Sequence, residues 1–129
     1  MRIAIIIARI LLGLMFLFAS ATYFLQSFET PEMHGNIKTF NEGLEASGYM
    51  MPLVKFIELI CALAFLSGRF VTLANIVLLP ITVNILLVHV FMAPEGLMTA
   101  VPVFLLHLFL IYAYRRNYVS LFAPKLNSI

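Results

Sequence analysis

The stretch FVTLANIVLLPITVNILLVHVFM, residues 70–92, is long enough to cross a bilayer as a helix and carries no formal charge. It nevertheless contains polar groups that a helix surrounded by lipid would not need. On a helix, Asn75, Thr82 and His89 follow one another at intervals of seven residues along one slowly drifting stripe. Asn84 points to the opposite side, and Pro80 leaves the carbonyl four residues before it without its usual partner. We therefore predict a central helix with protein neighbours on two sides.

The composition of the whole chain indicates a membrane protein with one domain. Its 129 residues are 63% hydrophobic and 11% charged, and the mean hydropathy is +1.04. A water-soluble domain of this size cannot bury so much apolar surface. The net charge of +2 argues against nucleic-acid binding, and the single Cys61 excludes an intrachain disulfide or a dithiol. We expect one domain over residues 1–129, with the lipid bilayer as its surroundings and no nucleic acid as a partner.

Four apolar segments are predicted to cross the membrane: residues 3–25, 50–66, 70–92 and 97–114. The first imitates a secretory signal, but Arg9 interrupts its apolar core, so we expect a retained helix. One face of that helix combines the charge with residues that favour close helix contact: Arg9, Gly13, Phe16 and Ser20. Two of the three connections are short, which favours antiparallel neighbours. The predicted fold class is all-α, an integral membrane four-helix antiparallel bundle.

The connection of residues 26–49 is the only long polar stretch, and it contains four glutamates against one lysine. Thr30, Pro31 and Glu32 predict a helix start, because Pro favours the first helical position. Apolar residues recur at positions 37, 40 and 44. We therefore predict a short amphipathic helix that lies on the outer membrane face.

The basic residues indicate the orientation. One side of the predicted bundle carries Arg2, Arg69, Arg115, Arg116 and Lys125, whereas the other has only Lys38 and the interfacial Lys55. The positive-inside rule then places both termini in the cytoplasm and the acidic connection outside. An interfacial aromatic cluster is predicted to follow the last span: Tyr112, Tyr114, Tyr118 and Phe122.

Polar side chains in the inner half of the predicted bundle form the candidate site. From the rise per residue, Arg9, His107, Glu58 and Asn75 lie roughly 7–13 Å from the inner ends of their helices. Because a bare charge is costly in lipid, we expect Arg9 to pair with Glu58, and Lys55 competes as the partner from one turn away. Three interpretations stay open: a pair that only fixes helix register, a layer that lines a ligand pocket, or a route for protons or ions.

The predicted pocket would take a lipophilic small molecule. Its candidate ligand-binding residues are Arg9, Glu58, Asn75, Asn84 and His107. A quinone head group needs one or two donors and apolar walls, and Arg9 and His107 would be the donors.

His89 lies near the outer surface and is a candidate for a separate outer-face site. It differs from His107 in depth by roughly 15 Å, so the two do not ligate one haem iron. No nucleophile–base pair, glycine-rich phosphate loop or metal-ligand spacing occurs in the sequence. We expect no catalytic residue, no metal site and no covalent cofactor, and hence a chain that is not catalytic on its own.

Three motifs resemble those of the DoxX family of membrane proteins. The opening ARILLGLMFLFASATYF resembles its first helix through Arg9, Gly13 and Phe16, although Tyr23 replaces a frequent lysine. ELICALAFLSGRF resembles its second helix through Glu58 and Gly68. VNILLVHVFMAPEGL resembles a third-helix ending through Asn84, His89, Pro94 and Gly96.

The resemblance implies a four-helix bundle in a bacterial inner membrane. Some members of the family are subunits of thiosulfate:quinone oxidoreductase or of other membrane redox assemblies, and relatives of the fold act as assembly factors. The expected function is therefore a small membrane subunit that binds a lipophilic ligand, with a quinone as the candidate. It would be an accessory subunit of an oxidoreductase, with other membrane or redox subunits as partners. The alternative is a non-enzymatic chaperone that grips client transmembrane helices, and a homo-oligomer is left open.

Overall fold

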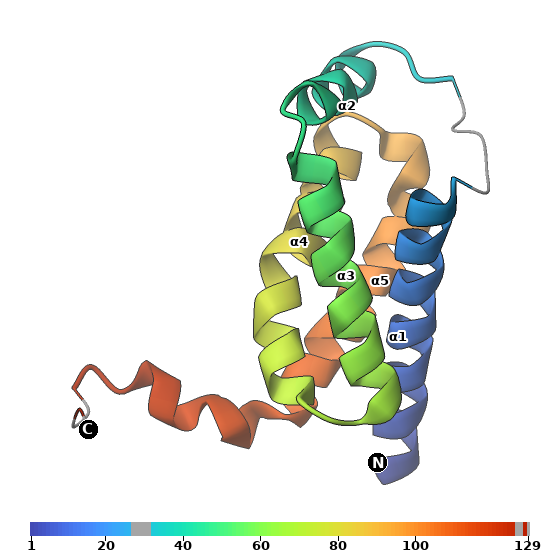
Figure 1. Cartoon of the computed structure of the whole chain (residues 1–129). Helices are drawn as coiled ribbons and strands as arrows, with labels where there is room; N and C mark the ends of the chain where they lie inside the picture. The colour runs from blue at the N-terminus through green and yellow to red at the C-terminus, as the bar shows by residue number, and fades with distance from the viewer. Residues whose placement is uncertain (27–31, 126–127, 129) are drawn as a thin grey trace.

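Four long helices pack side by side in the computed structural model, which describes residues 1–26, 32–125 and 128 (Figure 1). They are α1 (Arg2–Leu25), α3 (Met50–Ser67), α4 (Val71–Phe91) and α5 (Leu97–Ala113), and each begins and ends within one residue of its predicted span. All four, α5 together with the short 3₁₀ turn η1 (Pro94–Gly96), are long and apolar enough to cross a membrane. The expectation of an all-α membrane bundle is confirmed.

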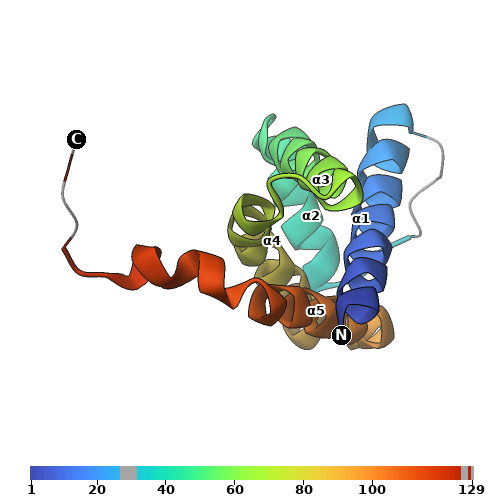
Figure 2. The ribbon, with the colours of Figure 1, turned by 90° about the horizontal axis from the view of Figure 1, so that it is seen from below.

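The helices form a ring in the order α1, α3, α4, α5, with neighbours antiparallel (Figures 1 and 2). α4 has two helix neighbours, α3 and α5, as predicted, but the prediction that it is central is wrong, because it is one member of the ring. α4 buries only the face with Asn75, Leu78 and Thr82, while Pro80 and Asn84 on its opposite face are exposed. The reason is geometric, because each member of a four-helix ring touches two neighbours through one side only.

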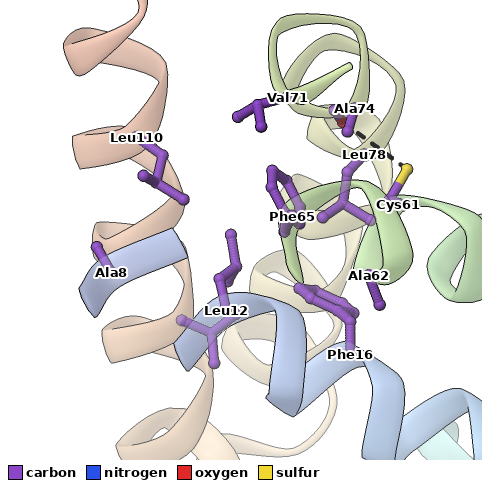
Figure 3. Close-up of a cluster of buried hydrophobic side chains, with 11 residues drawn as sticks. Ala8, Leu12, Phe16, Cys61, Ala62, Phe65, Val71, Ala74, Leu78 and Leu110 are labelled. Carbon is purple, nitrogen blue, oxygen red and sulfur yellow. Dashed lines mark hydrogen bonds between the residues drawn. The ribbon is translucent and has the colours of Figure 1, made fainter. Parts of the chain in front are cut away.

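The core lies along the axis of this ring. Four of its largest fully buried side chains come from four different helices: Leu12, Phe65, Leu78 and Leu110 (Figure 3). The outward faces are apolar as well, and large side chains such as Phe56, Leu73 and Leu105 are more than half exposed. Lipid is as apolar as these side chains, so the exposed faces need no protein cover.

The two ends of the bundle differ. The first residue, the α3–α4 turn and the final segment lie at one end, and helix α2 (Asn36–Ala46) lies over the other (Figure 1). We call these the inner end and the outer end, following the predicted topology. Which of them faces the cytoplasm stays a prediction.

The predicted start of α2 is wrong. The helix begins at Asn36, after Gly35, whose φ of 76° is readily available only to glycine, and Glu32 is not helical. Thr30 and Pro31 lie outside the described residues. The glycine breaks the helical geometry before the chain reaches its amphipathic stretch.

A final 3₁₀ helix, η2 (Arg115–Phe122), leaves the inner end sideways instead of continuing α5 (Figures 1 and 2). Two side-chain hydrogen bonds attach it to α4. Asn117 Nδ2 donates to Thr72 Oγ1 at 2.8 Å, and Asn75 Nδ2 donates to the Tyr118 hydroxyl at 3.0 Å. Tyr118 is consequently buried and does not share the interfacial position of Tyr112, which is exposed.

Candidate functional site

Glu58 is paired within its own helix. Lys55 Nζ lies 3.2 Å from Glu58 Oε2, and the side chains are 19% and 3% exposed respectively. The predicted pair of Arg9 with Glu58 is therefore wrong, and the competing partner Lys55 takes that position. A lysine three residues away on the same helix reaches the carboxylate without any alignment between helices.

Arg9 lies at the inner end, over the α3–α4 turn. A Cβ added at Gly68 would lie 2.6 Å from Arg9 Nη1, so the guanidinium occupies the space that the glycine leaves. Gly68 follows Glu58 by ten residues, which on a helix separates them by roughly 15 Å. Arg9 forms no ion pair with any described residue, and its buried Nε has no hydrogen-bond partner.

His107 is wholly buried between α5 and α4, and its ring packs in a T-shaped arrangement with Phe65 at a ring-centroid distance of 6.3 Å. Its Nδ1 lies 3.0 Å from Thr82 Oγ1, and the Thr82 hydroxyl lies 3.1 Å from the Leu78 carbonyl oxygen. That hydroxyl has only one hydrogen, which can point to the Leu78 carbonyl or to His107 Nδ1, so this contact by itself does not fix the tautomer of His107. His107 Nε2 is buried and has no hydrogen-bond partner among the described residues.

Asn75 is also wholly buried and only half satisfied. Its Nδ2 donates to the Tyr118 hydroxyl, but its Oδ1 has no partner. The Asn75 backbone carbonyl lies near the His107 ring, so the two residues are neighbours across α4 and α5. The structure thus brings together two of the predicted site residues, and each keeps one buried polar atom without a hydrogen-bond partner among the described residues.

Asn84 and His89 lie elsewhere. Asn84 is on the exposed face of α4 and forms no side-chain hydrogen bond in the described parts of the chain. His89 Nδ1 donates to the Ile85 carbonyl at 2.7 Å, and its ring lies against Gly96, where an added Cβ would overlap it. The single layer expected from helix depth is therefore divided among the inner end, the Lys55–Glu58 pair, the Asn75–His107 pair and the outer turn.

Two residues of the Asn75–His107 site were missing from the predicted set. Thr82 was recognised only as part of a polar stripe, and Tyr118 only as part of the aromatic cluster. Their roles depend on helix rotation and on the path of η2, for which the sequence has no local signal. Cys61 is buried, with its Sγ donating to the Ala74 carbonyl at 3.8 Å (Figure 3). Among the described residues no three His, Cys, Asp or Glu side chains are grouped to hold a metal ion.

A sequence model of the DoxX family matches residues 4–93, more than half of the chain. The chain belongs to the DoxX family. It is a multi-pass membrane protein of that family, in agreement with its four membrane-length helices. Comparison with curated proteins and with solved structures found no match. The matched range of this DoxX protein includes Asn75 but ends before α5, so the Asn75–His107 site joins a family helix to a helix outside the match.

Proposed function

We propose that this DoxX protein is a small membrane subunit that binds a lipophilic ligand with a hydroxylated head group between α4 and α5, with a quinol as the candidate. The observation that supports it is the pair of buried polar atoms, His107 Nε2 and Asn75 Oδ1, that have no hydrogen-bond partner among the described residues. A buried polar atom without a partner costs roughly 1–3 kcal/mol, so such atoms persist where something else satisfies them. The subunit would serve a membrane redox assembly, as the family resemblance implies.

The donor and acceptor pattern decides which redox form fits. A quinone presents carbonyl oxygens and needs donors, whereas a quinol presents hydroxyl groups that donate. The proposal takes the tautomer in which His107 Nδ1 donates to Thr82, so that its other nitrogen accepts, and Asn75 Oδ1 can only accept. Among the described side chains, Arg9 Nε at the inner end is a further buried donor without a partner. The proposal therefore reverses the role expected for His107: it would accept from a quinol instead of donating to a quinone.

The test is a titration of the detergent-purified full chain with a short-chain ubiquinol, followed by native mass spectrometry. His107→Leu and Asn75→Leu should each weaken binding by about tenfold, because each removes one acceptor. His89→Leu is the matched control, since His89 is a membrane-span histidine bonded to its own helix. An affinity that is unchanged in both site variants, with ubiquinol still bound, would point to a buried water between the acceptors and contradict the proposal.

Thr82→Val sharpens the same test. The variant removes the hydroxyl that accepts from His107 Nδ1 in the proposed tautomer, so either ring nitrogen can then carry the hydrogen. We expect the preference for ubiquinol over ubiquinone to shrink in this variant. A preference that stays the same would show that the Thr82–His107 bond does not select the redox form.

A second candidate function rests on Asn84. An amide on the lipid-facing side of α4, with the Pro80 defect on the same face, is suited to hydrogen-bond a neighbouring transmembrane helix. This would make the protein an assembly factor or chaperone that grips client helices. Asn84→Leu separates the two functions, because it should reduce helix association and leave ubiquinol binding unchanged.

A further inference from the structure

A depression of about 330 Å³ lies at the inner end, where α5 gives way to η2. It is lined by five consecutive residues: Ala113, Tyr114, Arg115, Arg116 and Asn117. Two arginines therefore border one small hollow at the end of a membrane-spanning helix. Cavities of this volume are within the range that holds small ligands or head groups.

The segment around the hollow is held in place. Asn117 is bonded to Thr72 and Tyr118 to Asn75, and these two α4 residues are three apart, on one side of the helix. Arg115 Nη1 donates to the Tyr112 carbonyl at 3.0 Å, and its guanidinium carbon lies 4.1 Å from the centre of the Tyr112 ring. One guanidinium is thus positioned in advance, with most of its five N–H donors free.

The charge around the hollow is of one sign. Further basic residues at the inner end are Arg2, the first residue of α1, and Arg69 in the α3–α4 turn, and Lys125 follows η2 in the chain. The described glutamates lie elsewhere: Glu32, Glu42, Glu45 and Glu95 belong to the outer connections, and Glu58 is paired with Lys55 inside α3. Arg116 is exposed and forms no hydrogen bond or ion pair with the part of the chain that the structure describes. Such a field attracts an anion.

The surroundings of the hollow indicate which anion is within reach. η2 leaves the bundle sideways, so in a membrane it runs along the surface (Figures 1 and 2). Tyr112 and Phe122, on either side of the arginines, are 61% and 83% exposed. Val119 and Leu121 are exposed as well, at 69% and 64%. Exposed aromatic and aliphatic groups next to arginines are typical of segments placed at the level of lipid head groups.

We propose that residues 113–117 bind the phosphate of an anionic phospholipid head group, with Arg115 and Arg116 as its ligands. The planar guanidinium presents two parallel N–H groups to phosphate oxygens, which a lysine does not. The bound lipid would anchor the inner end of α5 and η2 to the leaflet. This site is separate from the one between α4 and α5, so neither proposal depends on the other.

The experiment measures lipid binding to the delipidated, detergent-purified full chain by native mass spectrometry. Phosphatidylglycerol should bind at least about tenfold more tightly than phosphatidylcholine. Arg115→Gln/Arg116→Gln should lose most of that difference. The matched control is Arg2→Gln/Arg69→Gln, which removes the same amount of charge from the inner end but away from the hollow. Its affinity for phosphatidylglycerol should fall by less than about threefold. Equal losses in both double variants would show diffuse attraction and overturn the site.

Two further arms keep the proposal testable. Arg115→Lys/Arg116→Lys keeps the charge but removes the two parallel N–H groups of each guanidinium, so the affinity for phosphatidylglycerol should still fall. Wild-type affinity in this variant would overturn recognition by the guanidinium groups. This variant also serves if the glutamine variant does not fold. Inorganic phosphate in tenfold excess over phosphatidylglycerol should not displace the lipid, and displacement would overturn the lipid as the source of the phosphate.

Discussion

Two buried polar regions of this bundle differ in how far their groups are satisfied. Lys55 and Glu58, on one helix, complete each other in an ion pair of 3.2 Å. Asn75 and His107, on two helices, each keep one buried atom without a partner. The first region needs nothing beyond the chain and has no evident use except stability. The second leaves two buried atoms without partners, and this difference is the basis for the ligand proposed between α4 and α5.

The largest expected effect breaks the completed pair. Glu58→Leu leaves the Lys55 ammonium, 19% exposed, without its partner. Removing one member of a buried pair costs roughly 3–5 kcal/mol in soluble proteins, and the figure in lipid is lower. Unfolding in detergent should show that Lys55→Leu/Glu58→Leu recovers part of the loss. Exposed Glu95→Leu is the control, with little effect expected.

The same experiment tests the rejected partner. Arg9→Leu and Glu58→Leu should give additive losses, since their side chains share no contact. A double variant that recovers stability would restore the pairing of Arg9 with Glu58.

A smaller loss of stability is expected when the Asn75–His107 region loses one of its existing hydrogen bonds. Tyr118→Phe removes the acceptor for Asn75 Nδ2, so neither polar atom of the buried amide then has a partner. The free energy of unfolding should fall by about 1–3 kcal/mol. Tyr112→Phe, with an exposed ring, is the matched control and should change stability little. Equal effects would show that the Asn75–Tyr118 bond does not form in the membrane.

The dependence on pH has the same origin. Burial raises the pKa of the Tyr118 hydroxyl above its usual value of 10.0, because desolvation disfavours the phenolate. A raised pKa in the folded state means that the stabilisation is complete below pH 10 and is lost as the pH rises through the folded value. Wild-type unfolding monitored above pH 10 should therefore show a steeper loss than Tyr118→Phe. Parallel curves would contradict the buried hydroxyl.

Arg9 is a further residue with a buried atom that lacks a hydrogen-bond partner, and Gly68 leaves the space that its guanidinium occupies. Gly68→Ala would place a Cβ against the guanidinium and force an alanine to a φ of 78°. The left-handed conformation alone costs about 1–2 kcal/mol. Gly43→Ala is the control with the opposite sign, because nothing lies within 4 Å of its Cβ and helical alanine gains about 0.5–1 kcal/mol. Two losses of equal size would contradict the role assigned to Gly68.

The sequence predicted what depends on local physics. The four membrane spans, the short outer helix and the placement of both terminal segments at one end follow from hydropathy, helix length and connection length. These properties can be read from one segment of the sequence at a time. The sequence predicted poorly which polar groups meet. α4 and α5 are apolar nearly all round, so no hydrophobic face fixes their rotation, and depth from the rise per residue carries an error of about 5 Å. Arg9 was paired wrongly for the second reason. Asn84 was assigned to the ligand site although its predicted face, opposite Asn75, is correct and turns out to be exposed. Tyr118 was placed wrongly because its position depends on the path of η2.

The smallest expected effect on folding concerns the amide on the other face of α4. Asn75 and Asn84 are chemically identical and belong to one helix, but Asn75 is wholly buried and Asn84 is exposed. Asn84→Leu should change the free energy of unfolding by less than about 0.5 kcal/mol, because no described residue bonds to its side chain. Asn75→Leu leaves the Tyr118 hydroxyl without its donor and should cost about 1–3 kcal/mol.

For association between chains we expect the opposite order, with a larger effect from Asn84→Leu than from Asn75→Leu. Fluorescence energy transfer between labelled copies in liposomes should fall in Asn84→Leu, since one interhelical hydrogen bond in lipid contributes about 0.6–2 kcal/mol. Asn75→Leu should leave the transfer as in the wild type, because its side chain does not reach the lipid-facing surface. If Asn84→Leu destabilises the monomer as much as Asn75→Leu and does not change the transfer, the exposed face of α4 has no role in helix association.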